Sequence, residues 1–262
     1  YLIFKKRIIN GVDHPRELHI NKEDESVKKA FENTKFFKNT NANVDFETLL
    51  ERAQTSAFIV LRNDTIIYEN YFNGFSKDST FTSFSVAKSF VSTLIGMAIS
   101  DGYIRSENDR ITEYLPELMK KDSLFSEITI KDLLSMSSGL AYSGDGFPSD
   151  DDITYQSPNL RAAIFNNVQV SEPSGRHWLY NNYNPLLLGL ILERTTKMSV
   201  SQYAEEKLWI GTNEGLFIGD TISGELSSGE KLPRIPPSRV GLKLNYELDN
   251  TSFEFSTMHT MK

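Results

Sequence analysis

Residues 84–90, with the sequence Phe-Ser-Val-Ala-Lys-Ser-Phe, constrain the fold of this chain more than any other stretch. They open an apolar pattern with helical spacing that stops at Asp101-Gly102, which predicts a buried helix. Two apolar runs precede it, at 57–61 and 65–72, with the turn signal Asn63-Asp64 between them. These runs predict a β-hairpin, so two strands lead into a helix whose first turn carries a serine and a lysine.

Ser85 and Lys88 are three residues apart, so on a helix their side chains lie one turn apart on one face. A serine hydroxyl becomes a good nucleophile when a neighbouring base takes its proton, and burial and the helix dipole can lower the pKa of a lysine at a helix start. The pattern Ser-x-x-Lys also occurs at 26–29, in a charged segment, and at 228–231, in a Gly/Ser-rich segment. Only the copy at 85–88 follows predicted strands and opens a buried helix, so we interpret it as a serine activated by a lysine base.

A second candidate region lies just before another strongly apolar helical pattern, at residues 185–194. Tyr180 and Asn182 lie in the turn that leads into it, a place that holds a phenol and an amide rigidly. The residues alone leave an alternative open, in which the tyrosine covers the core with its hydroxyl satisfied and the asparagine caps the helix. We interpret the nearby His177 and Trp178 as packing residues.

Composition excludes several classes of function. The net charge of −7 argues against a nucleic-acid surface. The chain has no cysteine, which excludes disulfides and thiolate chemistry, and its four histidines show no metal-ligand spacing. We therefore expect no metal and no cofactor. No stretch approaches the ~20 apolar residues of a membrane span.

The N-terminal segment has two interpretations. Residues 1–4 are apolar and residues 5–7 are basic, which is the pattern at the end of a removed signal or of a membrane anchor that lies upstream of Tyr1. A short apolar strand end with a few surface charges fits the same residues. These two interpretations leave the localisation open. A periplasmic, secreted or membrane-anchored protein is favoured over a cytoplasmic one.

Further local patterns predict a loop and several helices. Residues 145–152 form an acidic segment that we interpret as a solvated, mobile loop, because the spacing and the bidentate glutamate of a calcium loop are missing. Thr129 predicts the start of a helix that ends at Ser138-Gly139. Additional helices are predicted within 23–37, 45–54, 160–166 and 201–209.

Four stretches, in this order along the chain, resemble the serine beta-lactamase-like family. They are Ser-Val-Ala-Lys at 85–88, Ile-Lys-Asp-Leu-Leu-Ser-Met-Ser-Ser-Gly-Leu at 130–140, Pro-Ser-Gly-Arg-His-Trp-Leu-Tyr-Asn-Asn at 173–182 and the helix segment 187–194. The family includes class C beta-lactamases, penicillin-binding DD-peptidases, family VIII esterases and 6-aminohexanoate-dimer hydrolases. The context of Trp178 and Tyr180 is most similar to the nylon-oligomer hydrolase and esterase branch.

The resemblance implies an α+β fold, an α/β sandwich of the beta-lactamase/transpeptidase type. A mainly antiparallel sheet would be flanked by helices, with a largely helical insertion between the two site motifs. We expect an N-terminal arm over residues 1–55, a beta-lactamase-like hydrolase region over 56–209 and a divergent tail over 210–262.

The resemblance also implies roles for four residues. Ser85 would attack a carbonyl carbon and form an acyl-enzyme, and Lys88 would accept or relay its proton. Tyr180 would exchange protons with the serine and the leaving group, and Asn182 would hydrogen-bond both the lysine and the substrate. The backbone N–H of Ser85 would supply half of an oxyanion hole. The substrate would be a small molecule with an amide or ester bond.

The sequence departs from the family in its tail. The third family motif, Lys/His-Thr/Ser-Gly on a late strand, is not found, and residues 258–262 are a faint echo that lacks the glycine. Alternating apolar residues predict a hairpin at 239–257, which either completes a small sheet or belongs to a truncated or altered reading frame that leaves the C-terminal part incomplete.

Three hypotheses for function follow. The first is a serine hydrolase of the Ser-x-x-Lys type. The second is a non-catalytic, degenerate or truncated family member that binds a peptide or cell-wall ligand, and the missing third motif favours it. The third is an unrelated α/β binding domain, which the four ordered matches disfavour.

Overall fold

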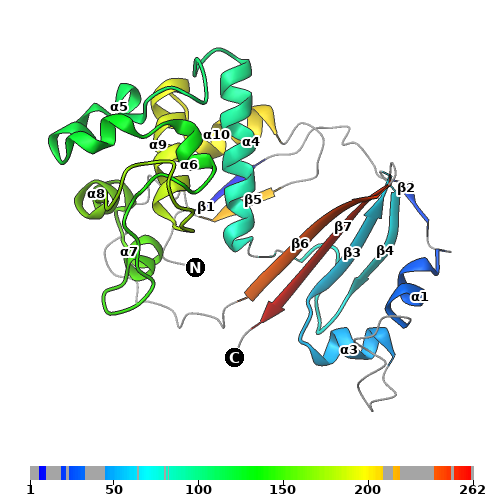
Figure 1. The fold of residues 1–262 in the computed structure, drawn as a ribbon. Coiled ribbons are helices and arrows are strands. Elements are labelled where there is room, and N and C mark those ends of the chain that lie inside the picture. The colour runs from blue at the N-terminus through cyan, green and yellow to red at the C-terminus, as the bar shows by residue number, and fades with distance from the viewer. Residues whose placement is uncertain are drawn as a thin grey trace. The chain divides into compact units, whose positions relative to one another are not determined.

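The chain divides into two units, each described here by itself (Figure 1). Arg16–Val86 and Arg234–Lys262 form the sheet unit, and Tyr1–Pro15 and Ala87–Pro233 form the helical unit. The computed structural model describes residues 6–9, 19–21, 24–32, 45–63, 65–79, 81, 83–208, 215–218, 239–248 and 251–260. For residues 6–9, 32, 215–218, 239–248 and 251–260 it describes the backbone alone.

The described strands of the sheet unit form one five-stranded sheet in the order β2-β4-β3-β7-β6. Its members are β2 (His19–Ile20), β3 (Ala57–Arg62), β4 (Thr65–Tyr71), β6 (Arg239–Leu248) and β7 (Thr251–Thr260). All neighbours pair antiparallel except β2 and β4, which are parallel. The hairpin expected before Ser85 is confirmed as β3 and β4, and the sheet is mainly antiparallel as predicted.

Two strands from residues 239–260 belong to this sheet. β7 lies beside β3, with Phe58 opposite Thr257 and Val60 opposite Phe255 in the register. β6 pairs with the other side of β7 and, like β2, lies at an edge of the sheet formed by the described strands. The alternating pattern of the tail therefore corresponds to strands that join the hairpin from the middle of the chain.

Two helices, α1 (Ser26–Glu32) and α3 (Phe46–Arg52), pack on one face of the sheet (Figure 1). α3 begins where the sequence predicts, because the carboxylate of Asp45 accepts the backbone N–H of Thr48 at 3.0 Å. The buried residues shared by these helices and strands are Val27, Phe46, Leu50, Phe58, Val60, Ile67, Tyr68 and Phe72.

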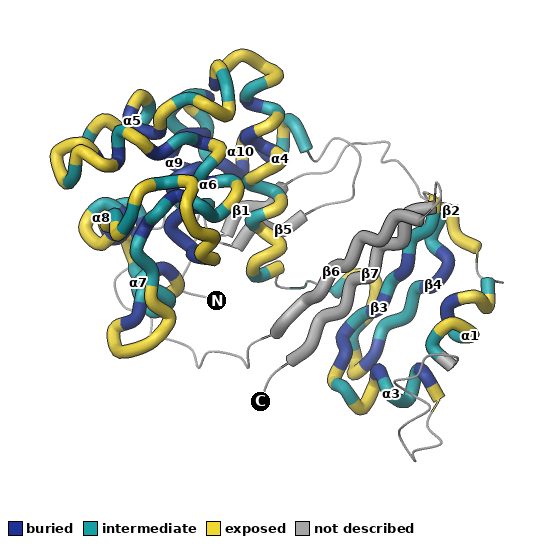
Figure 2. The backbone as a smooth tube through the Cα atoms, viewed as in Figure 1, coloured by how far each residue is buried: buried dark blue, intermediate teal, exposed yellow. Residues whose placement is uncertain are grey.

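The helical unit is built around two 14-residue helices, α4 (Ala87–Ser100) and α9 (Tyr183–Thr196). Both expected apolar patterns are thus confirmed as helices, and their inner faces share one core, with Leu94, Ile95 and Leu187 among its fully buried residues. Figure 2 shows buried stretches along both helices. Other helices of this unit are α5 (Ile111–Tyr114), α6 (Ile130–Leu134), α7 (Asp150–Gln156), α8 (Leu160–Asn167) and α10 (Val200–Lys207), with the 3₁₀ helices η2 (Pro116–Lys120) and η3 (Ser123–Glu127).

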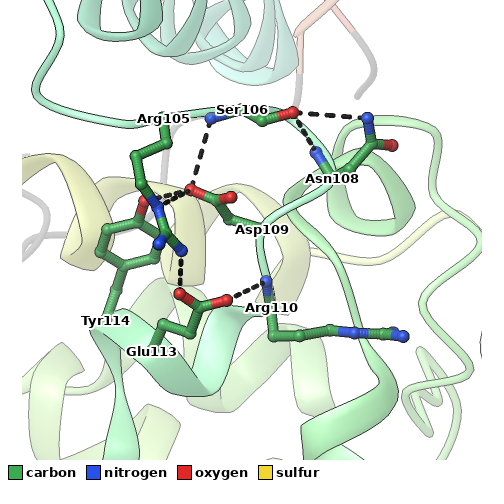
Figure 3. A network of polar contacts seen from close by, with 7 residues as sticks. All are labelled: Arg105, Ser106, Asn108, Asp109, Arg110, Glu113 and Tyr114. Carbon is green, nitrogen blue, oxygen red and sulfur yellow. Dashed lines mark hydrogen bonds and ion pairs between the residues drawn. The ribbon is translucent and has the colours of Figure 1, made fainter.

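A polar network orders the connection from α4 to α5 (Figure 3). The Arg105 guanidinium pairs with the carboxylates of Asp109, at 3.3 Å, and of Glu113. Asp109 also accepts the Tyr114 hydroxyl and the backbone N–H of Ser106. Side chains on both sides of the turn therefore hold the same carboxylate, which fixes where α5 begins.

Two expected boundaries were wrong. Residues 150–152 of the acidic segment are not loop but the first turn of α7, because Ser149 and Asp152 form a reciprocal cap with bonds of 3.1 and 3.0 Å. The helix that starts at Thr129 ends at Leu134 instead of continuing to Ser138. It ends there because Met136 has a left-handed backbone (φ +58°), so the next carbonyls point to another segment.

At the N-terminus, residues 1–5 of the apolar and basic segment lie outside the described residues. β1 (Lys6–Ile9) follows and pairs antiparallel with β5 (Gly215–Ile218). Across the described ranges, none of the helices combines the length and the apolar character needed to cross a membrane.

Candidate active site

The four predicted site residues lie on three segments. Ser85 is exposed in the 3₁₀ turn η1 (Phe84–Val86), which leads directly into α4, and Lys88 is the second residue of α4. Tyr180 and Asn182 lie in the turn before α9. The boundary between the two units falls at Val86, so Lys88, Tyr180 and Asn182 belong to the helical unit, and their geometry is given by that unit alone.

Lys88 is the centre of this cluster. Its Nζ donates a hydrogen bond to Oδ1 of Asn182 at 2.7 Å and lies 4.7 Å from the centroid of the Tyr180 ring. An ammonium at this distance from the face of a tyrosine is attracted by the ring electrons. The packing of α4 on α9 therefore brings together residues that are 94 positions apart in the chain.

The Tyr180 ring is open to solvent, with 44% of its surface exposed. The centroid of the Trp178 ring lies 6.2 Å away, and Trp178 is 69% exposed. Within the described part of the chain, no hydrogen bond is formed by the Tyr180 hydroxyl. The alternative of a tyrosine that covers the core with a satisfied hydroxyl is thus excluded, and the phenol is accessible to a ligand.

The structure does not bury His177 and Trp178, which the sequence indicated as packing residues. Both side chains are exposed, and Nδ1 of His177 lies 2.6 Å from the Glu172 carboxylate. The loop that carries them therefore presents aromatic and polar groups at the surface next to Tyr180.

Asn182 is 9% exposed and connects Lys88 to a second set of polar side chains. Its Nδ2 donates to the Tyr142 hydroxyl at 2.8 Å, to Oδ1 of Asp151 at 3.0 Å and to Oγ1 of Thr154 at 3.3 Å. Although Asn182 occupies the N-cap position of α9, its side chain makes no capping hydrogen bond. The amide is therefore used for Lys88 and α7 and not for the helix end.

Sequence reasoning missed Tyr142, Asp151 and Thr154. No motif marks them, and Asp151 lay in the segment interpreted as loop. The one available signal was the cap formed by Ser149 and Asp152, which predicts a helix start and would have placed Asp151 in a first helical turn.

Burial raises the pKa of Tyr142 far above its ordinary value, and the hydrogen bond to Asp151 adds to this effect. Burial likewise raises the pKa of Tyr183, whose hydroxyl donates to Asp150 at 2.7 Å. Both phenols therefore keep their protons at neutral pH and act as donors to the two carboxylates of α7.

The segment 136–140 holds the Tyr180 loop through backbone hydrogen bonds. The carbonyl of Met136 accepts the N–H of Leu179 at 2.8 Å, and the carbonyl of Ser137 accepts the N–H of Gly175 at 2.7 Å. Gly139 approaches the loop so closely that a Cβ atom there would lie 2.1 Å from the carbonyl oxygen of Glu172. The Ser-Ser-Gly-Leu stretch thus acts as a support for the candidate site.

The described side chains do not form a set of ligands for a metal ion. Among these residues, no group of three or more His, Asp or Glu lies together as a metal site requires. The carboxylates of Asp150, Asp151 and Asp152 are each bonded to protein donors.

Comparison with known sequences gives two matches of interest. The sequence model of the family described as Beta-lactamase matches residues 45–214. A 6-aminohexanoate-dimer hydrolase of Paenarthrobacter ureafaciens is 35% identical over 101 residues, which are 38% of this chain and 25% of that protein. The chain therefore matches about a quarter of the length of that curated relative.

Comparison with solved structures concerns the fold. A Bacillus anthracis protein described as a 6-aminohexanoate-dimer hydrolase has a TM-score of 0.68 and 20% identity, covering 85% of this chain and 62% of that one. A class C beta-lactamase has a TM-score of 0.52 and 18% identity, covering 73% of this chain and 50% of that one. The predicted α+β fold of the beta-lactamase/transpeptidase type is confirmed.

Proposed function

This chain belongs to the serine beta-lactamase-like family, and we propose that it is a serine hydrolase that cleaves an amide or ester bond through an acyl-enzyme on Ser85. The observation that carries the proposal is the cluster in the helical unit. Lys88 is held at 2.7 Å by Asn182 and lies against the exposed ring of Tyr180. A base, a second proton carrier and an orienting amide therefore converge on the first turn of the helix that follows Ser85.

In the acylation step, Oγ of Ser85 would attack the carbonyl carbon of the substrate while Lys88, which has to be in its neutral amine form for this step, takes the hydroxyl proton. The carbonyl double bond opens, and the negative charge moves to its oxygen. The backbone N–H of Ser85, at the start of α4, would donate to that oxygen. One such donor typically contributes about 3 kcal/mol to the stability of the transition state.

Collapse of this intermediate breaks the bond to the leaving amine or alcohol. Tyr180 would deliver a proton to the leaving atom, and the proton on Lys88 would restore the phenol. A water molecule then attacks the acyl carbon with the same groups acting as bases, which releases the acid and regenerates Ser85. Asn182 would hold Lys88 in place through both steps.

The second oxyanion donor would come from a strand beside the nucleophile. In the sheet unit, β6 contacts η1, so a backbone N–H of β6 is the candidate donor. The family's third motif is absent from the sequence, so this donation would use backbone without the Lys-Thr-Gly side chains.

For the substrate, we propose a small molecule with an amide or ester bond. Support comes from the relatives named as hydrolases of the 6-aminohexanoate dimer, and from the aromatic pair Trp178 and Tyr180 beside Lys88. These rings would contact an apolar part of the substrate.

Covalent labelling tests the proposal. The full chain is treated with a fluorescent fluorophosphonate, and the intact mass is compared among the parent, Ser85→Ala and Ser89→Ala. Ser89 is an exposed serine four residues further on, so it controls for non-specific reaction of hydroxyls. One adduct that is lost only in Ser85→Ala supports the hydrolase, and turnover of p-nitrophenyl esters then establishes deacylation.

Absence of an adduct on a folded parent chain would refute this function. The non-catalytic family member that binds a peptide or cell-wall ligand would then be the better hypothesis. A fluorescent penicillin used in the same three chains distinguishes a penicillin-reactive site from an esterase site.

A further inference from the structure

We propose that Asp151, on α7, is a positioning residue that fixes the orientation of the Asn182 amide so that its oxygen faces Lys88. The inference rests on the proposed function and extends it to a residue outside the family motifs. Asp151 touches neither Lys88 nor the substrate in this scheme; it acts through the 3.0 Å hydrogen bond to Nδ2 of Asn182.

The argument begins with the asymmetry of an amide. The side chain of Asn182 has an oxygen that accepts and a nitrogen that donates two hydrogens. The oxygen accepts a hydrogen bond from Nζ of Lys88 at 2.7 Å, and the nitrogen faces acceptors on the other side. Rotation by 180° would place the amide nitrogen against Nζ of Lys88 and the amide oxygen against the carboxylate of Asp151, so the hydrogen bond to Asp151 would become a repulsive contact between two acceptors.

Among the three partners of the Asn182 nitrogen, only Asp151 enforces this orientation. The hydroxyls of Tyr142 and Thr154 both donate and accept, so either could turn to satisfy an inverted amide. An ionised carboxylate accepts only, so it cannot pair with the amide oxygen. The orientation of the amide therefore depends on the charge state and identity of residue 151.

Asp151 also sets the direction of the Tyr142 hydroxyl. That hydroxyl has a single hydrogen, which is donated to Oδ1 of Asp151 at 2.5 Å, so its oxygen is left to accept from Asn182. The raised pKa of Tyr142 keeps this hydrogen in place at neutral pH. Without the carboxylate, the hydroxyl could donate to Thr154, 3.4 Å away, or to an inverted amide.

The carboxylates on either side of Asp151 in α7 have other partners. Asp150 accepts the Tyr183 hydroxyl at 2.7 Å and the backbone N–H of Ser143 at 2.7 Å. Asp152 closes the cap with Ser149. The three consecutive carboxylates thus bind different partners, and only Asp151 binds the Asn182 amide, which holds Lys88.

The test compares Asp151→Asn with the parent by the kinetics of fluorophosphonate labelling. This substitution keeps the shape and removes the charge that forbids the inverted amide. At saturating reagent we expect the labelling rate constant to fall about tenfold, which corresponds to about 1.4 kcal/mol. The half-saturating concentration should stay within about twofold, because Asp151 does not touch the reagent.

Two controls isolate the route of action. Asp152→Asn changes the adjacent carboxylate in the same helical turn, and it should lower the melting temperature while leaving the labelling rate unchanged. In an Asn182→Ala background, Asp151→Asn should cause no further loss of rate, because the amide through which it acts is gone.

An independent readout does not need activity. In ¹⁵N–¹H spectra, the Nδ2 hydrogens of Asn182 should exchange slowly with solvent in the parent and in Asp152→Asn, and faster in Asp151→Asn. The proposal is overturned if Asp151→Asn keeps the parent exchange rate, labels at the parent rate, or loses as much rate in the Asn182→Ala background. A parent chain without any Ser85 adduct would instead refute the proposed function, and the amide exchange would still decide the role of Asp151.

Discussion

Replacing Gly139 with alanine should destabilise the helical unit far more than the same change at a glycine with a similar backbone angle. Gly139 has φ +73°, and its carbonyl accepts the backbone N–H groups of Ser171, at 2.9 Å, and Glu172, at 3.3 Å. A Cβ atom at this position would lie 2.1 Å from the backbone oxygen of Glu172, where no flexible side chain can move aside. The two segments would have to separate.

The size of the effect follows from two contributions. An alanine in the left-handed region costs about 1–2 kcal/mol. Separation of the segments weakens the two hydrogen bonds to the Gly139 carbonyl, at about 1 kcal/mol each. The expected loss of unfolding free energy is therefore about 3–4 kcal/mol.

Gly102 provides the matched control. It has φ +79° after the end of α4, and an added Cβ would meet nothing within 4 Å. Gly102→Ala should therefore lose only the backbone contribution, about 1–2 kcal/mol. Urea unfolding of the parent and both variants, followed by circular dichroism and by tryptophan fluorescence, measures the difference. Equal losses in the two variants would show that the contact with Glu172 does not constrain the fold.

Three further predictions concern Lys121, the ion pair between Arg194 and Glu117, and Lys88. Lys121 donates to three backbone carbonyls around the end of α8, so Lys121→Met should lower the unfolding free energy by about 2 kcal/mol in urea unfolding, whereas Lys120→Met should change it little. Arg194 holds the pKa of Glu117 below its ordinary value, so this pair stabilises fully above about pH 4.3 and less as pH falls through the lower folded pKa. Melting temperatures from pH 7 to pH 3 should therefore fall less in Glu117→Gln than in the parent, and parallel curves would contradict this. Lys88→Met removes the proposed base and should slow fluorophosphonate labelling at least about a hundredfold; an unchanged rate would exclude that role.

Local signals predicted most of the elements correctly. Thr129 caps α6 with a reciprocal bond to Asp132, and Asp45 caps α3, as expected from a side-chain oxygen placed before an apolar run. The apolar spacing that predicted α4 and α9 reflects a core that both helices share. These features depend on residues within one or two turns of each other, so they can be found without knowing the fold.

The errors arose where contacts between segments distant in the sequence determine the local structure. α6 stops early because the carbonyls that follow it bind the backbone of Leu179 and Gly175, some 40 residues further on. Trp178 was interpreted as a packing residue, but its side chain is exposed, and the loop that carries it is held by those same bonds. Composition and spacing cannot indicate which partner a backbone carbonyl will find.

The sequence by itself determined the family, the two helices of the site and the residues to which roles are proposed. It did so because a three-residue spacing, a cap or an apolar stripe acts within a few residues. Only the tertiary structure decided that Asn182 turns its amide to Lys88 and to Asp151, and that strands from the tail pair with the sheet beside β3. The two hydrogen bonds join residues 94 and 31 positions apart, and the strand pairing joins residues still further apart in the chain. These contacts exist only once helices and strands have packed, because the packing brings the hydrogen-bonding groups together.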